Sequence, residues 1–109
     1  MSKTIYEFES PFDRTKVTVQ IAKYGNNRNA IQLTEADTGF PYMTCTVNMP
    51  HVTLNSFEVL IKDYSENEGV LKFLVDNNIV TDTGRGEVSG FVVLPICILN
   101  DPKEWRKPC

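Results

Sequence analysis

A single stretch of this sequence, residues 63–78, has apolar residues at helical spacing, and the rest has the alternation typical of strands. The apolar residues of the stretch form one stripe: Val70, Leu71, Phe73, Leu74 and Val75. A helix with one apolar stripe must bury it against another element. We therefore predict one helix over 63–78 that packs across one face of a sheet.

The beginning of this stretch carries a capping sequence. Ser65 and Glu68 have the spacing of a capping box, in which the Ser65 hydroxyl accepts a hydrogen bond from the Glu68 N–H, and the Glu68 carboxylate accepts one from the Ser65 N–H. Glu66 adds negative charge to the first turn, which the helix dipole favours. Asn77 and Asn78 tolerate the left-handed conformation that ends many helices. These signals predict that the helix is continuous.

Alternating apolar and polar residues predict a series of strands on both sides of the helix. The predicted strands are 4–9, 14–24, 30–36, 40–49, 56–62 and 91–99. The turn residues at 10–13 predict a hairpin between the first two strands. Short polar turns at 25–29 and 37–39 then continue the chain as an antiparallel meander.

The end of the chain contains its most apolar run, 91–99, which is typical of a strand near the centre of a sheet. Pro95 within it requires a bulge, a bend or an edge position. The preceding segment 81–90 is punctuated by glycines, and we interpret it as a loop. We expect a single α+β domain over 1–99, with an antiparallel sheet of about five or six strands and one helix on one face, followed by a polar tail at 100–109.

The composition restricts the partners of this domain. The formal net charge is −3, which weighs against nonspecific binding to nucleic-acid phosphates, because that binding needs clustered Lys and Arg. The same acidity fits docking onto a basic surface, or solubility alone. No segment reaches the roughly 18 apolar residues of a membrane span, and the N-terminus has no secretory pattern. We therefore expect a cytoplasmic protein that does not contact a membrane.

No set of residues has the pattern of an active site. The single histidine, His51, follows a proline at the end of a strand, and strand geometry does not bring it to Cys45. Cys45 and Cys97 lie within apolar strand patterns, where a free thiol behaves as a small buried hydrophobe. Cysteines and histidine are not spaced as zinc ligands. We therefore expect no catalytic residues, no metal and no cofactor.

Acidic residues gather around the predicted helix, and they are the first candidate for partner binding. The residues concerned are Glu58, Asp63, Glu66, Glu68 and Asp76. Carboxylates on an exposed surface can imitate spaced phosphates and so occupy a basic nucleic-acid channel of another protein. The alternative is an ordinary solvated helix face, and the sequence does not separate the two.

Arg85 and the C-terminal tail supply a second candidate set. Arg85 lies between Gly84 and Gly86, which either allow a ligand to approach the backbone closely or form a structural turn. Trp105 is flanked by cationic residues, among them Arg106. An indole beside cations can stack on an unpaired base or dock in a groove. A disordered tail, or an indole folded back onto the sheet, is the alternative.

Several short motifs resemble a small domain family of unknown function that is common on phages, plasmids and conjugative elements of Firmicutes. In the second half of the chain they are DYSENEG at 63–69, IV at 79–80, TGR at 83–85, SGFV at 89–92 and PIC at 95–97. In the first half they are KYGNN at 23–27, IQL at 31–33 and TVNMP at 46–50. The resemblance covers nearly the whole chain, and it implies a genomic context but no catalytic residues.

Small acidic proteins on such elements are often inhibitors of host defence, including anti-CRISPR proteins, which bind a Cas nuclease or its guide RNA complex. We therefore predict a non-enzymatic inhibitor of a bacterial defence nuclease, in particular an anti-CRISPR protein that blocks guide RNA or DNA engagement in the bacterial host cytoplasm. The alternative is a mobile-element accessory protein that binds single-stranded nucleic acid through Arg85, Trp105, Arg106 and Lys107. The sequence leaves open whether the chain also forms a homo-oligomer through an exposed strand edge.

Overall fold

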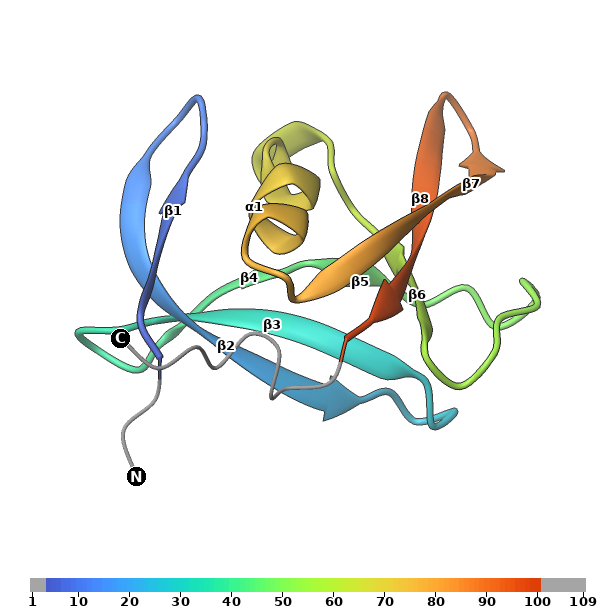
Figure 1. Cartoon of the computed structure of the whole chain (residues 1–109), viewed down its shortest axis with the longest axis horizontal. Coiled ribbons are helices and arrows are strands. Elements are labelled where there is room, and N and C mark those ends of the chain that lie inside the picture. Colours follow the sequence, from blue (N-terminus) through green and yellow to red (C-terminus); the bar gives the residue numbers. More distant parts are fainter. Residues whose placement is uncertain (1–3, 101–109) are drawn as a thin grey trace.

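Residues 4–100 are described by the computed structural model, and their strands form two antiparallel sheets beside one α-helix (Figure 1). The first sheet has the strand order β1-β2-β3-β4, and the second has β5-β6-β8-β7. The elements are β1 (Tyr6–Glu9), β2 (Arg14–Lys23), β3 (Asn29–Glu35), β4 (Pro41–Thr44), β5 (Thr46–Val47), β6 (Glu58–Ile61), η1 (Ser65–Asn67), α1 (Val70–Asp76), β7 (Val80–Ser89) and β8 (Val92–Leu99). The predicted α+β class is confirmed, whereas the prediction of one sheet of five or six strands is wrong.

The first sheet is the meander that the alternation predicts. β1 and β2 form the hairpin, with Tyr6 opposite Val17, and β3 and β4 follow as successive neighbours. At the hairpin turn the Ser10 hydroxyl accepts hydrogen bonds from the N–H groups of Phe12 and Asp13, both at 3.1 Å. Turn chemistry and alternation act between residues close in sequence, so here they identify the neighbouring strands.

The change from one sheet to the other occurs at Cys45, in the middle of the predicted strand 40–49. β4 pairs with β3, whereas β5 pairs with β6. The Cys45 N–H donates to the Ile31 carbonyl of β3, and the Cys45 carbonyl accepts from the Lys62 N–H just after β6, both at 2.8 Å. Alternation continues without interruption through this segment, so the sequence does not reveal that the pairing partner changes.

The glycine-punctuated segment 81–90 is not a loop but most of β7, so that prediction is wrong. β7 pairs with β8 in two stretches, and the register shifts between Asp82 and Arg85, where Gly84 has a φ of 80°. The bulge therefore uses the glycine that looked like a loop residue. β8 lies between β6 and β7, as its apolar run predicts. Pro95 sits beyond the last β6 pair at Ile96, so its missing N–H costs no ladder bond to β6.

The predicted helix 63–78 is broken at Gly69, which has a left-handed φ of 99°. Before it lies the short 3₁₀ turn η1, and after it comes α1. The capping box is absent, because Ser65 makes no side-chain cap. The Asp63 carboxylate instead accepts from the N–H groups of Gly69 and Leu71, at 3.1 and 3.0 Å. A carboxylate held in front of the helix thus replaces the box, and the predictions of a continuous helix and a Ser65 cap are wrong.

Replacing Asp63 with alanine is expected to lower the free energy of unfolding by about 1 kcal/mol, since it removes the acceptor for two helix N–H groups. Asp63→Asn keeps one side-chain oxygen and is expected to lose less. Urea unfolding of both variants measures the difference. Asp37→Ala, at an exposed turn, is the matched control. Equal losses for Asp63→Ala and Asp37→Ala would show that the Asp63 cap does not stabilise α1.

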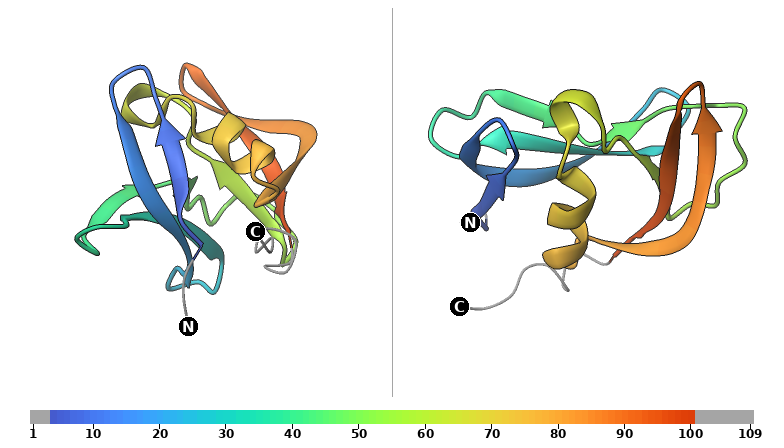
Figure 2. Two further views of the ribbon diagram at one scale, coloured as in Figure 1. Left: turned by 60° about the vertical axis from the view of Figure 1, so that its left-hand side comes forward. Right: turned by 90° about the horizontal axis from the view of Figure 1, so that it is seen from above.

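Two apolar clusters lie on the two faces of β6, whose four residues are all buried. The larger cluster joins both sheets and α1, and its buried members are Phe8, Val17, Ile31, Leu33, Cys45, Val59, Ile61, Val70, Phe73, Leu74, Ile79, Val80 and Cys97. The smaller cluster contains Val52, Leu60, Leu94 and Ile96. In Figure 2 the β1–β2 and β7–β8 hairpins stand on either side of α1. The helix thus fills the space between two sheets rather than covering one.

Candidate functional site: an acidic groove between β1 and α1

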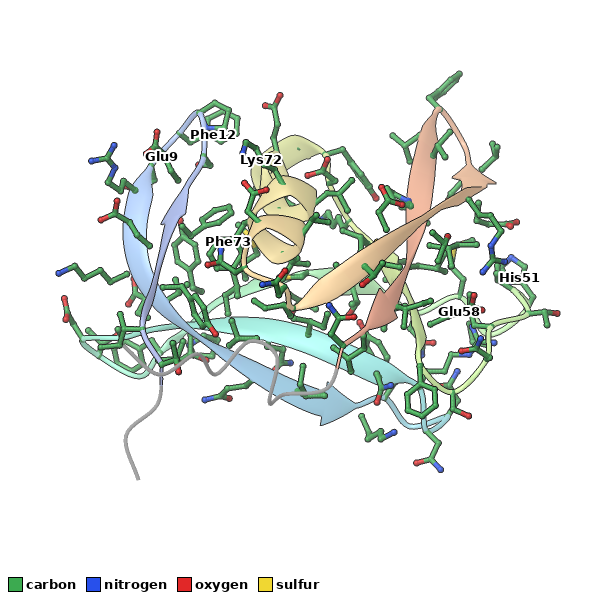
Figure 3. The ribbon with its side chains drawn as sticks, in the orientation of Figure 1. Glu9, Phe12, His51, Glu58, Lys72 and Phe73 are labelled. Atoms are coloured by element: carbon green, nitrogen blue, oxygen red, sulfur yellow. The ribbon has the colours of Figure 1, made fainter. Side chains whose placement is uncertain are left out.

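The structure pairs two of the predicted binding residues, Glu58 and Arg85, with each other. Glu58 is buried at the start of β6, where one carboxylate oxygen accepts from the Asn55 N–H at 3.0 Å and the other from the Arg85 guanidinium. The Asn55 hydrogen bond, and then Arg85, lower the pKa of Glu58. Figure 3 places Glu58 beneath the β7–β8 hairpin, away from Glu9 and Lys72. Glu58 therefore lies outside the exposed acidic surface, and Arg85 already has a carboxylate partner.

The other predicted carboxylates lie around η1 and α1, and most of them have partners. Asp63 caps the helix, as described above. Glu66 pairs with Lys62, and Asp76 pairs with Lys72, each four residues away in sequence. The hydrogen bond from Lys62 is the main cause that lowers the pKa of Glu66 to about 2. Glu68 is exposed at the end of η1. The predicted acidic face thus exists in part, with its charges largely compensated.

A groove of about 420 Å³ runs between β1 and α1 and collects carboxylates that are far apart in sequence. We call it the β1–α1 groove. It is lined by Glu7, Glu9, Gly69, Lys72, Phe73, Asp76 and Asn77. Figure 3 shows Glu9 and Phe12 on the hairpin beside the part of α1 that carries Lys72 and Phe73. Of the predicted site residues, this groove contains Asp76.

The groove exists because β1 presents alternate residues to two environments. Tyr6 and Phe8 point inward and contact the Phe73 ring edge-on, with ring centroids 5.9 and 5.3 Å apart. Glu7 and Glu9 are consequently directed outward, since successive strand residues face opposite sides. The alternation of β1 therefore indicates that these two glutamates point outward, but it does not indicate that α1 lies beside them.

A glycine lies at the start of α1, beside β1. Gly69 has a φ of 99°, which other residues rarely adopt, so the backbone conformation requires glycine here. A Cβ atom at this position would lie 3.4 Å from the Glu9 carbonyl oxygen, which is ordinary van der Waals contact. Gly69 thus serves the helix break, at a point where α1 and β1 are in contact.

The charges in and beside the groove leave it negative. The carboxylates of Glu7, Glu9 and Asp76 face two cations, Lys72 and Arg14, so one negative charge is uncompensated. Arg14 lies 2.7 Å from Glu9 and 3.7 Å from Glu7, and all of these side chains are more than half exposed. Exposed ion pairs are worth little. The carboxylates can therefore exchange these cations for Lys or Arg of a partner at small cost.

The residues considered for catalysis lie apart from one another. Burial raises the pKa of Cys45 and of Cys97 to about 12, so both thiols stay protonated at neutral pH, and the prediction that they are buried is confirmed. His51 is exposed and lines a different groove, beside Arg85 and Glu87. Within residues 4–100, no group of three or more His, Cys, Asp or Glu residues has the arrangement of a metal site. Trp105 and Arg106 lie outside the described residues.

No helix within the described part of the chain is long and apolar enough to span a membrane.

Comparison with known proteins assigns a family. A family model described as a domain of unknown function, DUF4313, matches residues 18–106. No curated protein and no solved structure matches the chain. The matched segment begins within β2, includes all elements from β3 to β8, and extends past β8. The chain therefore belongs to the DUF4313 family of domains of unknown function.

Proposed function

We propose that this chain is a non-enzymatic inhibitor of a bacterial defence nuclease, an anti-CRISPR protein that binds a Cas effector through the β1–α1 groove. The observation that carries the proposal is the convergence of Glu7 and Glu9 from β1 with Asp76 from α1 on one surface. Nucleases bind the phosphates of guide and target through clustered Lys and Arg. A rigid surface with spaced carboxylates is complementary to such a cluster.

The mobile-element context of the sequence motifs supports the choice of target, as an argument from association. Two features of the groove support the mode of binding. Its charged groups are exposed and only weakly engaged with each other. Its backbone is rigid, because β1 is fixed to α1 by the contacts of Tyr6 and Phe8 with Phe73. Binding thus requires little ordering of the inhibitor, which favours affinity.

Cleavage of target DNA by a type II Cas nuclease tests the proposal, with the purified chain added before or after guide RNA loading. Inhibition only on early addition would identify guide assembly as the blocked step, and inhibition in both orders would identify DNA binding or cleavage. Added salt is expected to weaken inhibition, because the contacts are between exposed charges. Absence of inhibition in both orders would overturn the Cas effector as the target.

The groove itself is tested by a double charge reversal, Glu7→Lys with Glu9→Lys. We expect the concentration for half-inhibition to rise at least about tenfold, equivalent to about 1.4 kcal/mol. The matched control is Glu35→Lys with Asp37→Lys, which makes the same change of net charge outside both the groove lining and the predicted acidic face. If the control pair loses as much inhibition as the groove pair, general charge and not the groove is responsible.

The alternative function, binding of single-stranded nucleic acid, uses Arg85 together with Trp105, Arg106 and Lys107. In the structure the Arg85 guanidinium is held by Glu58, and the other three lie outside residues 4–100. A gel shift with a labelled oligonucleotide separates the two functions. A shift that disappears steeply with added salt supports the alternative.

A further inference from the structure

β7 forms the longest free edge of the two sheets. It has ten residues, of which 85–89 follow the bulge without a register shift, whereas the other edge strands, β1, β4 and β5, have four, four and two. An edge strand presents a row of backbone N–H and C=O groups that another strand can pair with. The side chains of Arg85 and Val88 are exposed along this edge. The edge of β7 therefore carries the longest row of backbone N–H and C=O groups that have no neighbouring strand in the two described sheets.

The register of the β7–β8 hairpin identifies which groups point outward. Gly90 and Phe91 form a two-residue turn between Ser89 and Val92, which face each other. Such a turn makes the flanking pair a hydrogen-bonded one, and along an antiparallel ladder hydrogen-bonded and open pairs alternate. The pairs Val88–Val93 and Gly86–Pro95 are consequently non-hydrogen-bonded pairs of the β7–β8 ladder. Their backbone groups point to the free edge.

Exposed apolar side chains lie along the same edge. Val88 and Val93 face each other across the hairpin and are 70% and 61% exposed. A methyl group of Val93 lies only 2.6 Å from the position that a Cβ atom of Gly86 would occupy, so Val93 leans over Gly86. The result is an apolar strip directly beside the outward-facing backbone of Gly86.

We propose that the chain forms a homodimer in which the β7 edges of two copies pair antiparallel, with Gly86 opposite Gly86 of the second copy. This register makes the outward N–H and C=O groups of the two glycines meet as a hydrogen-bonded pair, about 5.5 Å apart between Cα atoms. In each copy the Val93 side chain, which leans over Gly86 from β8, covers this glycine pair from its own side. The two four-stranded second sheets then join into one continuous sheet.

Charge selects this register and a second copy as the occupant. Arg85 and Glu87 flank Gly86 on the same face, so the two-fold axis through Gly86 sets each Arg85 opposite Glu87 of the second copy. The Arg85 side chain is 59% exposed, so it can approach this glutamate while it stays paired with Glu58 of its own chain. Moving the axis by one residue sets Glu87 against Glu87, or Arg85 against Arg85, and like charges directly opposite are destabilising. The edge is thus complementary to itself in one register.

Sedimentation velocity on the purified chain, from about 1 μM to about 1 mM, measures this association. The wild type is expected to move from the mass of one chain to that of two within the range. Glu87→Arg, which keeps the Glu58–Arg85 pair, should raise the dimer dissociation constant at least about tenfold. Glu68→Arg makes the same charge change away from β7 and should leave the constant unchanged.

Two further variants test the register and the backbone contact. Glu87→Arg is mixed with a second variant that carries Arg85→Glu together with Glu58→Gln, so that no unpaired buried carboxylate is left beside position 85. The mixture restores opposite charges in both cross-strand pairs and should form a heterodimer. Val88→Pro removes an outward N–H without touching the β8 ladder, and it should raise the dissociation constant as well. Circular dichroism confirms that each variant is folded before its association is scored.

A wild type that stays monomeric over the whole range overturns the dimer, and so does an unchanged constant for Glu87→Arg. The measurement uses the chain alone, without nuclease. Its failure therefore leaves the inhibitor proposal intact, and failure of the inhibitor proposal leaves the dimer intact.

Discussion

Replacing Phe73 with alanine is expected to lower the free energy of unfolding by about 3–5 kcal/mol, which is the usual cost of deleting a buried phenyl ring. Phe73 is 6% exposed and belongs to the larger apolar cluster. Its ring contacts Tyr6 and Phe8 of β1 edge-on. The side chain thus joins α1 to the first sheet, and its loss leaves a cavity at that junction. Such a loss is a large share of the 5–15 kcal/mol that stabilises a typical domain.

Chemical denaturation with guanidinium measures the effect of Phe73→Ala, with Phe12→Ala as its control. Phe12 is 70% exposed at the β1–β2 turn, so it loses the same atoms without leaving a cavity. We expect a change within about 0.5 kcal/mol for Phe12→Ala. A loss for Phe73→Ala no greater than for Phe12→Ala would mean that α1 does not depend on its contact with β1.

Replacing Leu60 with alanine is expected to lower the free energy of unfolding by about 2–5 kcal/mol, although Leu60 does not belong to the cluster around α1. Leu60 is 1% exposed and lies in the smaller cluster with Val52, Leu94 and Ile96. The prediction follows from the burial of β6 on both faces, which gives the second sheet a packed surface of its own. Truncating Leu60 therefore weakens the attachment of segment 50–54 to β6 and β8.

Thermal unfolding followed by circular dichroism measures the change for Leu60→Ala, and Phe57→Ala serves as the comparison. Phe57 immediately precedes β6 and is 65% exposed. A melting temperature for Leu60→Ala equal to that for Phe57→Ala would show that the smaller cluster contributes little, and that segment 50–54 is held by its polar contacts. Those contacts include the hydrogen bond that the Arg28 guanidinium donates to the Val52 carbonyl.

The strands and the first meander could be predicted because alternation reports which face of a strand is buried. Alternation does not report the identity of the neighbour. Segment 40–49 is the clearest case, since the chain leaves one sheet and enters another at Cys45 while the pattern continues. The number of sheets is thus set by long-range pairing of β5 with β6 and of β6 with β8. No local window of sequence contains that information.

The prediction located the body of the helix, α1, correctly, but it placed the start of the helix too early. Two sets of residues compete for the first N–H groups of α1, and the sequence contains both. The Ser65–Glu68 spacing fits a capping box, yet Gly69 adopts a left-handed φ that breaks the helix between them and its body. Asp63 then reaches the freed N–H groups. The conformation of one glycine decides between the two caps.

The sequence identified single residues of the candidate site, but it did not indicate which of them lie together in the groove. Asp76 was identified from its place on the helix, and it lines the groove. Glu58 looked like part of an acidic face, but it forms an ion pair with Arg85, which is 27 residues away in sequence. Glu7 and Glu9 were missed because nothing near them in sequence places α1 at their side. Contacts over such distances belong to the tertiary structure.

The central position of β8 has a consequence for the synthesis of the chain. β8 is the last described strand to leave the ribosome, and it supplies the partner of both β6 and β7. Until Leu99 has emerged, the second sheet lacks its central strand, and the buried strand β6 lacks its β8 neighbour. A chain cut before β8 therefore lacks the common partner of these two strands. Such a chain is expected to leave the backbone edges of β6 and β7 unpaired, which makes it prone to pair with other chains.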